Sequence, residues 1–279
     1  MTALSLPFAE AVPVLLPAYD QLNLVLIGCG GTGGWLAVNL PRIAYLQKLA
    51  GKKVVITLID PDIVESKNIP RQNFISSDLG LPKAAVLAAR YGLQWGMEIN
   101  AIVAPFKVEM GYPDWKSMTI CIGAVDNPEA RVEIAKVLQD RKSTFWLDCG
   151  NHFESGQVLL GSRSRIADMK GAFQVPTFCT GLPSPGIQHP DLLVEQKVKN
   201  KLMSCEEAAI ANAQSMSINQ RIANEALDML LRLLSGTLTR FASYVNCKYG
   251  TAWSKFITPG EVSDVIGKSE KFLKTKTTG

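Results

Sequence analysis

The sequence has 279 residues, of which 47% are hydrophobic and 19% are charged, and its formal net charge is +4. This composition predicts a globular chain with one large α/β domain or two small ones, and the mild charge does not favour nucleic-acid binding. No run of about 18 apolar residues predicts a membrane span, and the first residues lack the basic flank of a secretory signal. We therefore expect a cytoplasmic protein without a membrane or nucleic-acid partner.

Alternating apolar and amphipathic segments predict an α/β fold with a doubly wound, mostly parallel sheet. In chain order, the expected strands are residues 22–28, 53–60, 99–105, 118–123, 144–148 and 156–161, with one or two more within residues 244–257. The expected helices are residues 33–49, 83–92, 128–139 and 205–235. Pro41 lies inside the first of these helices and is expected to kink it.

The chain is expected to form a single domain over residues 21–257, preceded by a packing arm over residues 1–20. Residues 163–203 are rich in proline and glycine and show little periodicity, so we interpret them as a long, flexible crossover loop. Residues 258–279 carry several lysines, and we interpret them as a solvated, frayed C-terminal tail.

The stretch of residues 28–33 (GCGGTG) directly follows the first expected strand, and the second strand ends in Asp60. A glycine-rich loop between a strand and a helix, with an acid closing the next strand, is typical of a βαβ nucleotide site. Glycines let the backbone approach a phosphate, and the free N–H groups of the helix N-terminus face its charge. The sequence therefore predicts nucleotide binding by Asp60 and by Gly28, Gly30, Gly31 and Gly33.

Three later segments extend this pattern: residues 60–74 (DPDIVESKNIPRQNF), 80–83 (GLPK) and 124–131 (AVDNPEAR). With the glycine loop, they resemble the ThiF/MoeB/E1 superfamily of ATP-dependent enzymes that activate ubiquitin-like and sulfur-carrier proteins. The superfamily pattern is G-x-G-G-x-G, D-x-D-x-V-x-x-S-N-x-x-R-Q, G-x-x-K and D-N-x-x-x-R. The resemblance covers roughly residues 21–236, and one departure is that Lys67 separates the Ser–Asn pair of the pattern.

The resemblance implies a Rossmann-like adenylation fold, ATP and Mg²⁺ as cofactors, and roles for individual residues. Arg71 and Lys83 match the pair that contacts the phosphates, and Asp126 matches the Mg²⁺ carboxylate. Asp60 matches the ribose contact, and the secondary polar contacts would come from Asn68 and Gln72. These residue types suit acyl-adenylate formation, because a carboxylate needs no general base but two anions must be brought together by cations and positioning.

The six cysteines form no CxxC pair, which argues against a four-cysteine zinc site. Cys205 opens the helix expected over residues 205–235, and the resemblance implies a catalytic thiol there that forms a thioester with the activated acyl group. A helix N-terminus lowers the pKa of a thiol, whereas Glu206 and Glu207 oppose this effect. Cys179, in the long loop, is the alternative nucleophile, and an inert thiol at both places also stays open. We interpret the other cysteines as packing residues.

Two activities follow from the resemblance. The first is an E1-like enzyme that adenylates the C-terminal carboxylate of a ubiquitin-like protein and transfers it through Cys205 to an E2-like protein. The second is a sulfur-carrier adenylyltransferase of the ThiF or MoeB type, although such enzymes usually carry two zinc-binding CxxC pairs. The chain without them resembles the ThiF-like E1 proteins of bacterial clusters with E2-like and JAB-type proteins, some of which act in antiviral defence. The resemblance also implies a homodimer, but no arginine precedes Arg42 to reach a partner's ATP site.

Two other classes of protein are weighed against these activities. An NAD-dependent oxidoreductase would use the glycine loop and Asp60, but it would leave Arg71, Lys83 and Asp126 without a role. A noncatalytic scaffold that has lost its activity is disfavoured by the same intact set of charged residues. Binding of a nicotinamide cofactor without ATP would indicate the first class, and absence of ATP–pyrophosphate exchange with the true partner would indicate the second.

Overall fold

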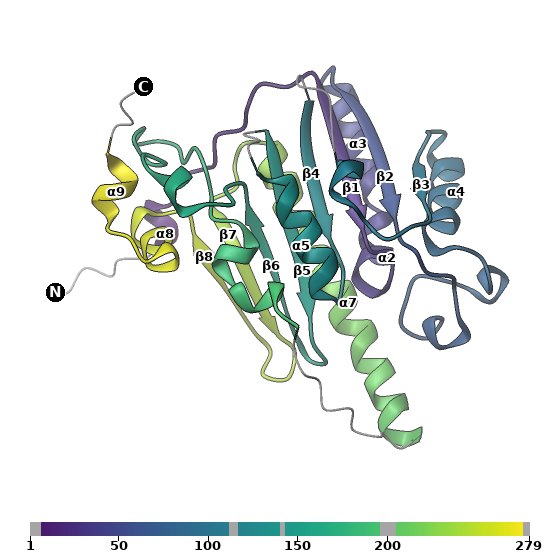
Figure 1. Ribbon diagram of the computed structural model, residues 1–279. Helices are drawn as coiled ribbons and strands as arrows, with labels where there is room; N and C mark the ends of the chain where they lie inside the picture. Colours follow the sequence, from purple (N-terminus) through teal and green to yellow (C-terminus); the bar gives the residue numbers. More distant parts are fainter. Residues whose placement is uncertain (1–6, 112–116, 140–142, 196–204, 276–279) are drawn as a thin grey trace.

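The computed structural model describes residues 7–111, 117–139, 143–195 and 205–275, with only the backbone described over residues 205–215. Within these ranges, eight strands form one sheet in the order β3-β2-β1-β4-β5-β6-β7-β8 (Figure 1). The strands are β1 (Gln21–Ile27), β2 (Lys53–Ile59), β3 (Asn100–Ile102), β4 (Ser117–Gly123), β5 (Thr144–Asn151), β6 (Ser155–Gly161), β7 (Arg240–Asn246) and β8 (Thr251–Phe256).

The first five strands are parallel, and the last three continue the sheet in antiparallel pairing. Ile27 at the end of β1 lies in register with Ile59 of β2 and with Gly123 of β4, so these strands end at one edge of the sheet. Open parallel sheets bind ligands outside the carboxyl ends of their strands. The α/β fold with a doubly wound, mostly parallel sheet and additional C-terminal strands is therefore confirmed.

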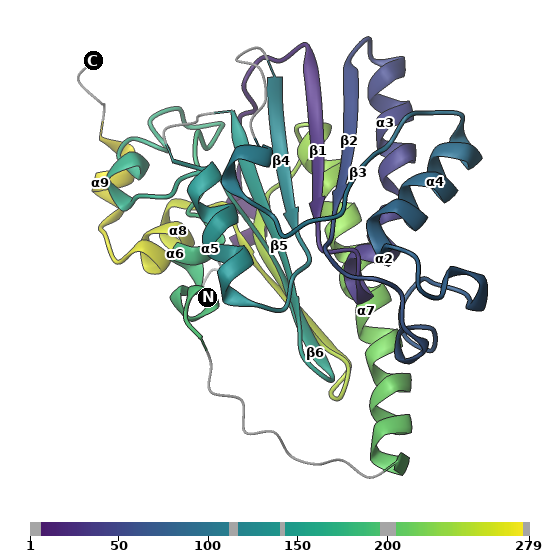
Figure 2. The ribbon, with the colours of Figure 1, turned by 45° about the vertical axis from the view of Figure 1, so that its right-hand side comes forward.

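Two apolar layers pack on opposite faces of the sheet, and Figures 1 and 2 show α5 on one face and α7 on the other. The larger cluster joins the sheet to α2, α3, α4 and α7, and the smaller one joins it to α5. The helices of these layers are α2 (Gly31–Ala37), α3 (Leu40–Leu49), α4 (Lys83–Trp95), α5 (Pro128–Val137) and α7 (Cys205–Leu234). Burial of the apolar helix faces against the sheet is the main source of stability for such an arrangement.

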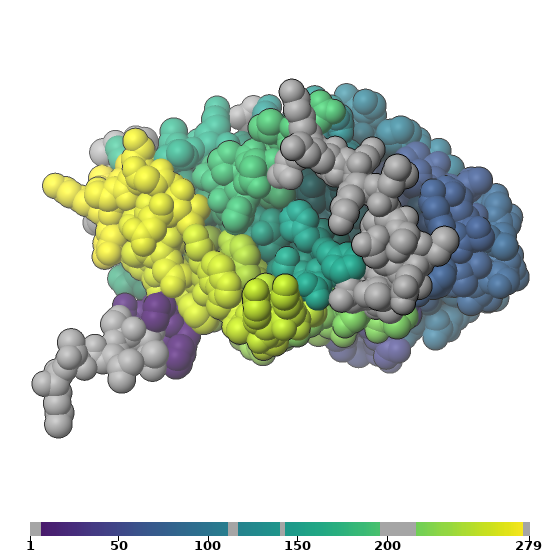
Figure 3. Space-filling model, turned by 90° about the horizontal axis from the view of Figure 1, so that it is seen from below, coloured from purple at the N-terminus to yellow at the C-terminus, as the bar shows by residue number. Residues whose placement is uncertain are grey.

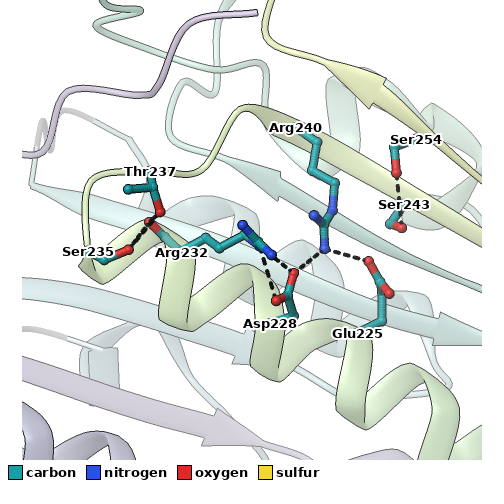
Figure 4. Close-up of polar contacts among 8 residues, drawn as sticks. All are labelled: Glu225, Asp228, Arg232, Ser235, Thr237, Arg240, Ser243 and Ser254. Carbon is teal, nitrogen blue, oxygen red and sulfur yellow. Dashed lines mark hydrogen bonds and ion pairs between the residues drawn. The ribbon is translucent and has the colours of Figure 1, made fainter. Parts of the chain in front are cut away.

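The second half of α7 is joined to β7 by a group of ion pairs (Figure 4). Arg240 of β7 donates to Glu225 at 2.8 Å and to Asp228 at 2.5 Å, and Asp228 also accepts from Arg232. Arg240 is largely buried, so solvent screens its two pairs less than it screens the exposed Asp228–Arg232 pair. These contacts hold the C-terminal half of α7 in one place on the sheet.

The expected kink at Pro41 is wrong, because residues 33–49 do not form one helix. The chain forms α2 and α3 with a break at residues 38–39, and Pro41 occupies the first turn of α3. Proline is well tolerated there, since the N–H group that it lacks would have no partner inside the helix.

Residues 163–195 of the expected flexible loop have ordered short helices: η4 (Ile166–Met169), α6 (Pro185–Gln188) and η5 (Pro190–Leu193). Met169, Cys179 and Leu182 are fully buried in the larger core cluster, so the expectation of a flexible segment is wrong for these residues. The N-terminal arm, which includes α1 (Pro7–Glu10), also packs here, because Leu15 and Cys179 are joined by a backbone hydrogen bond of 2.8 Å. Residues 196–203 of the loop lie outside the described residues.

The C-terminal segment is likewise not a frayed tail over its described part. Residues 258–275 contain α8 (Pro259–Ile266) and α9 (Glu270–Lys274), and Val262 and Leu273 are fully buried. Lys271 and Lys274 of α9 are exposed, whereas Leu273 of the same helix is buried in the core. Residues 276–279 lie outside the described residues. In the described part of the chain, no helix combines the length and the hydropathy that crossing a bilayer requires.

The remaining short 3₁₀ helices lie in the connections between strands and helices. They are η1 (Ser66–Asn68) and η2 (Ser76–Asp78), which follow β2, and η3 (Val108–Gly111), which follows β3. In Figure 3 the segment that contains η1 and η2 is coloured blue and lies at one end of the view.

Candidate nucleotide site

The glycine loop lies between β1 and α2, where two parts of the backbone approach each other very closely. Gly28 has a φ of +89°, and a Cβ there would collide with the carbonyl oxygen of Ala124, which follows β4. A Cβ at Gly33 would collide with the carbonyl oxygen of Gly28. Close packing of the backbone therefore requires glycine at both positions, whether or not a ligand is bound.

The change Gly33→Ala should lower the free energy of unfolding by about 3 kcal/mol, since the colliding atom is a backbone oxygen that cannot rotate away. Thermal or urea unfolding of the purified protein measures this loss. The matched control is Gly260→Ala in α8, where a Cβ would meet only the carboxylate of Glu270 at 3.6 Å. Equal stabilities of the two variants would contradict the assigned packing of the loop.

Asp60 follows β2 directly and holds the glycine loop against this strand. Its Oδ2 accepts a hydrogen bond of 2.6 Å from the backbone N–H of Cys29, and its Oδ1 accepts one of 2.8 Å from Asp62. Burial raises the pKa of the Asp60 carboxyl, while the two backbone N–H groups and Lys83 act in the opposite direction. The predicted ribose contact would add to this structural role through the remaining lone pairs of the carboxylate.

Gln72 presents an unsatisfied polar atom beside the loop. The side chain is buried, its Oε1 has no hydrogen-bond partner, and its Nε2 would lie 3.7 Å from a Cβ built at Gly30. Buried carbonyl groups in proteins nearly always have a partner, so an unsatisfied one at a glycine-lined surface fits a bound ligand that donates a hydrogen bond. The residues present therefore fit a nucleotide, whose ribose hydroxyls are such donors. Asn68 is also buried, but its Oδ1 accepts from the backbone of Glu65 and caps η1.

Arg71 lies in the connection between η1 and α4, next to Gln72, and its side chain is half-buried. Among the residues that the structure describes, none forms a hydrogen bond or an ion pair with its guanidinium group. A guanidinium with no partner among these residues can bind phosphate oxygens through two parallel N–H groups.

Lys83 is the first residue of α4, and its side chain is almost fully buried. Its Nζ lies 2.8 Å from Oδ2 of Asp62, whose side chain is 63% exposed. The same Asp62 also accepts a backbone hydrogen bond from Lys83 through its carbonyl oxygen, at 2.9 Å. These two contacts hold Lys83 next to the segment that contains Asp60. A phosphate group could replace the exposed carboxylate of Asp62 as the partner of the Lys83 ammonium.

Asp126 is exposed and lies in the loop between β4 and α5. It follows Ala124 by two residues, and Ala124 contacts Gly28 of the glycine loop. Asn127 begins α5, since its Oδ1 accepts the backbone N–H of Ala130 at 2.8 Å. In the described ranges, no three His, Cys, Asp or Glu side chains gather into a metal site. A single carboxylate fits Mg²⁺ that shares its other positions with phosphates and water.

Sequence reasoning missed a cluster of amides that joins the site to α7. Asn219 of α7 accepts a hydrogen bond from Asn151 at the end of β5, and it contacts Thr32 in the first turn of α2. Its Nδ2 donates to the backbone carbonyl oxygen of Arg71 at 3.3 Å. The available signal was a polar residue on the otherwise apolar face of an amphipathic helix.

The described thiols separate into buried and accessible ones. Cys179 is fully buried, its Sγ donates to the carbonyl oxygen of Gly181, and burial raises its pKa to about 12. Its sulfur is therefore neither accessible nor ionised near neutral pH, and the alternative nucleophile of the sequence analysis is wrong. Cys205 begins α7, but its side chain lies outside the described residues. Cys247 is partly exposed at the end of β7.

The structure thus brings the glycine loop, Asp60 and Gln72 together at one edge of the sheet, with Arg71 and Lys83 on neighbouring segments. Asp126 comes from the adjoining loop after β4. Figure 3 looks onto this edge, and Figure 2 shows the first turns of α7 extending beyond it. This arrangement combines a glycine cradle with two cations and one carboxylate, which suits binding of a magnesium nucleotide.

Comparison with known proteins agrees with this geometry. A family model described as "ThiF family" matches residues 16–254 of the chain. No curated protein sequence matches the chain.

Solved structures show the same fold at low sequence identity. Escherichia coli MccB with AMPCPP and MccA has a TM-score of 0.56 and 16% identity, over 84% of this chain and 63% of the MccB chain. E. coli MccB with ATP gives a TM-score of 0.55 and 17% identity, over 88% of this chain and 67% of that chain. PaaA gives a TM-score of 0.55 and 15% identity, over 86% of this chain and 74% of the PaaA chain. The chain thus spans less than two thirds of the first of these proteins.

Proposed function

Because the chain belongs to the ThiF family, we propose that it uses ATP to adenylate the C-terminal carboxylate of a small ubiquitin-like protein. The observation that carries the proposal is Arg71, a half-buried cation with no partner among the described residues, beside the unsatisfied Gln72 and the glycine loop. MccB has been solved with ATP, and with AMPCPP together with MccA, which supports a nucleotide and a second bound partner in this fold.

In the proposed reaction, a carboxylate oxygen of the substrate attacks the α-phosphorus of ATP. One P–O bond forms to the acyl oxygen, and the P–O bond to pyrophosphate breaks, so that pyrophosphate leaves with its electron pair. Arg71 and Lys83 would hold the phosphates and stabilise the charge that develops around the α-phosphorus. When bound, Mg²⁺ supplies neutralisation of the leaving pyrophosphate, and Asp126 would hold it.

The next proposed step transfers the acyl group to a thiol. The thiolate of Cys205 attacks the acyl carbon of the adenylate, a C–S bond forms, and AMP leaves as the C–O bond breaks; the thiol proton passes to solvent. An E2-like protein would then accept the acyl group from this thioester. The alternative is a sulfur-carrier adenylyltransferase, in which a sulfur donor attacks the adenylate in place of Cys205.

ATP–pyrophosphate exchange with candidate ubiquitin-like and sulfur-carrier proteins tests the adenylation step. Exchange is expected with one of them and is expected to disappear when the C-terminal carboxylate of that protein is converted to a primary amide. Exchange that persists with the amidated protein would contradict activation at the C-terminal carboxylate. Tight binding of a nicotinamide cofactor without ATP binding would instead favour the oxidoreductase.

The thioester step makes a separate prediction for Cys205. Intact mass spectrometry of the protein with ATP and its partner should show an adduct that hydroxylamine removes and that Cys205→Ala abolishes. Cys247→Ala is the matched control, since Cys247 is the partly exposed thiol of the described residues. Adenylation should persist in both variants. An adduct that survives in Cys205→Ala but not in Cys247→Ala would show that Cys247, at the end of β7, accepts the acyl group instead of Cys205.

A further inference from the structure

The buried face of α7 contains one polar side chain among the described residues. Its buried apolar residues include Ile218, Ile222, Ala226 and Met229, whereas Asn219 is 3% exposed. A buried amide lowers stability unless its donors and acceptor form hydrogen bonds. The hydrogen bonds of Asn219 therefore explain why an amide is tolerated at this buried position.

Those contacts reach three separate segments of the proposed nucleotide site. Oδ1 of Asn219 accepts from Nδ2 of Asn151 at 2.5 Å and lies 3.4 Å from Oγ1 of Thr32. Nδ2 of Asn219 donates to the carbonyl oxygen of Arg71 at 3.3 Å. The carboxamide also occupies the space beside Gly31, where a Cβ would lie 2.6 Å from Cγ of Asn219. The side chain therefore joins α2, β5 and the Arg71 segment at a single point.

The Arg71 segment is held from its other side by α4 and α2. Nδ2 of Asn73 donates to the carbonyl oxygen of Gly34 at 3.0 Å, and Nη1 of Arg90 donates to the carbonyl oxygen of Asn73 at 2.9 Å. Between these contacts and Asn219, the backbone of Arg71 has a fixed place while its guanidinium has no protein partner among the described residues. A cation aimed at a phosphate works best when its backbone is held in advance.

We propose that Asn219 is a positioning residue, which sets the place of the Arg71 guanidinium for a phosphate group of the bound nucleotide. The inference rests on the proposed function, because it assigns Arg71 to phosphate. It goes beyond that function by placing part of the phosphate selectivity on α7, distant in sequence from every motif of the nucleotide site. A packing role alone would change stability without changing the preference for phosphorylated ligands.

Calorimetric titrations with ATP plus magnesium chloride and with adenosine separate these two roles. Asn219→Leu keeps the volume of the side chain but removes its hydrogen bonds, and it should weaken ATP binding by about tenfold while adenosine binding stays within about twofold. Arg71→Ala should have the same pattern, and the double variant should be no weaker than Arg71→Ala, because both changes remove one interaction. The control Asn224→Leu alters an exposed asparagine of the same helix and should bind both ligands normally.

A second variant tests the same hydrogen bond in case Asn219→Leu does not fold. Asn151→Leu removes the donor to Asn219 from an exposed strand end, and it should lower the ATP-to-adenosine selectivity by about threefold. Normal selectivity in both Asn219→Leu and Asn151→Leu, with Arg71→Ala impaired, would overturn the positioning role alone. A wild-type protein that binds ATP no better than adenosine, with no effect of Arg71→Ala, would instead overturn the proposed function.

Discussion

Replacing Arg71 with alanine is expected to lower kcat/KM for ATP–pyrophosphate exchange by about 100- to 1000-fold, which corresponds to about 2.7–4 kcal/mol of transition-state stabilisation. The guanidinium has no partner among the described residues, so its removal leaves none of the described carboxylates unpaired. The loss would therefore come from the phosphate contact, and the unfolding temperature should stay close to that of the wild type.

Arg232→Ala is the matched control for this experiment. Arg232 lies in the last turn of α7 and pairs with Asp228, at the end of the helix away from the site (Figure 4). Exposed ion pairs of this kind contribute little to stability, so the variant should exchange pyrophosphate at the wild-type rate. Normal exchange by Arg71→Ala would remove Arg71 from the proposed chemistry.

The second large effect is expected for Asp126→Ala, which should abolish magnesium-dependent exchange and leave the fold intact. Asp126 is exposed, and the cap of α5 is made by Asn127, so the substitution removes neither packing nor the helix start. Mg²⁺ is usually held by one or two carboxylates together with phosphates, and loss of the carboxylate would leave it held by the nucleotide alone. Exchange measured over a range of magnesium concentrations gives the readout.

The control for Asp126 is Glu129→Ala, which removes an exposed carboxylate from the first turn of α5. That variant should require the same magnesium concentration as the wild type. Binding of ATP without magnesium should be unchanged by Asp126→Ala, because no metal contact is then involved. An Asp126→Ala variant with a normal magnesium requirement would show that another group holds the ion.

The parallel half of the sheet could be predicted from local patterns. Apolar runs such as residues 22–27 and 118–123 are long enough for buried strands, and strand ends differ from expectation by at most a few residues. The break between α2 and α3 has a local signal in Pro41, which from the sequence alone predicts a kink. Proline lacks the N–H that would bond to the carbonyl oxygen of Ala37, and the structure starts a new helix there, with Pro41 in its first turn.

For the C-terminal segment and the loop after β6, the sequence predicted less ordered structure than the protein has. Proline, glycine and lysine content indicated flexibility for residues 163–203 and 258–279, yet Met169, Leu182 and Leu273 are fully buried. Composition averages over residues, whereas burial is decided by a few apolar side chains that find partners far away in the chain.

By itself, the sequence determined the α/β class and the family, because motif spacing places the glycine loop after β1, Asp60 after β2 and Asp126 after β4. Only the tertiary structure decided that Cys179 is an inert core thiol and that Asn219 joins α7 to the carbonyl of Arg71. The reason is physical. The carboxyl ends of parallel strands lie at one edge of the sheet, so residues that follow these strands are brought close together by the topology alone. Burial, and side-chain pairing between residues 148 positions apart, depend on how the layers pack.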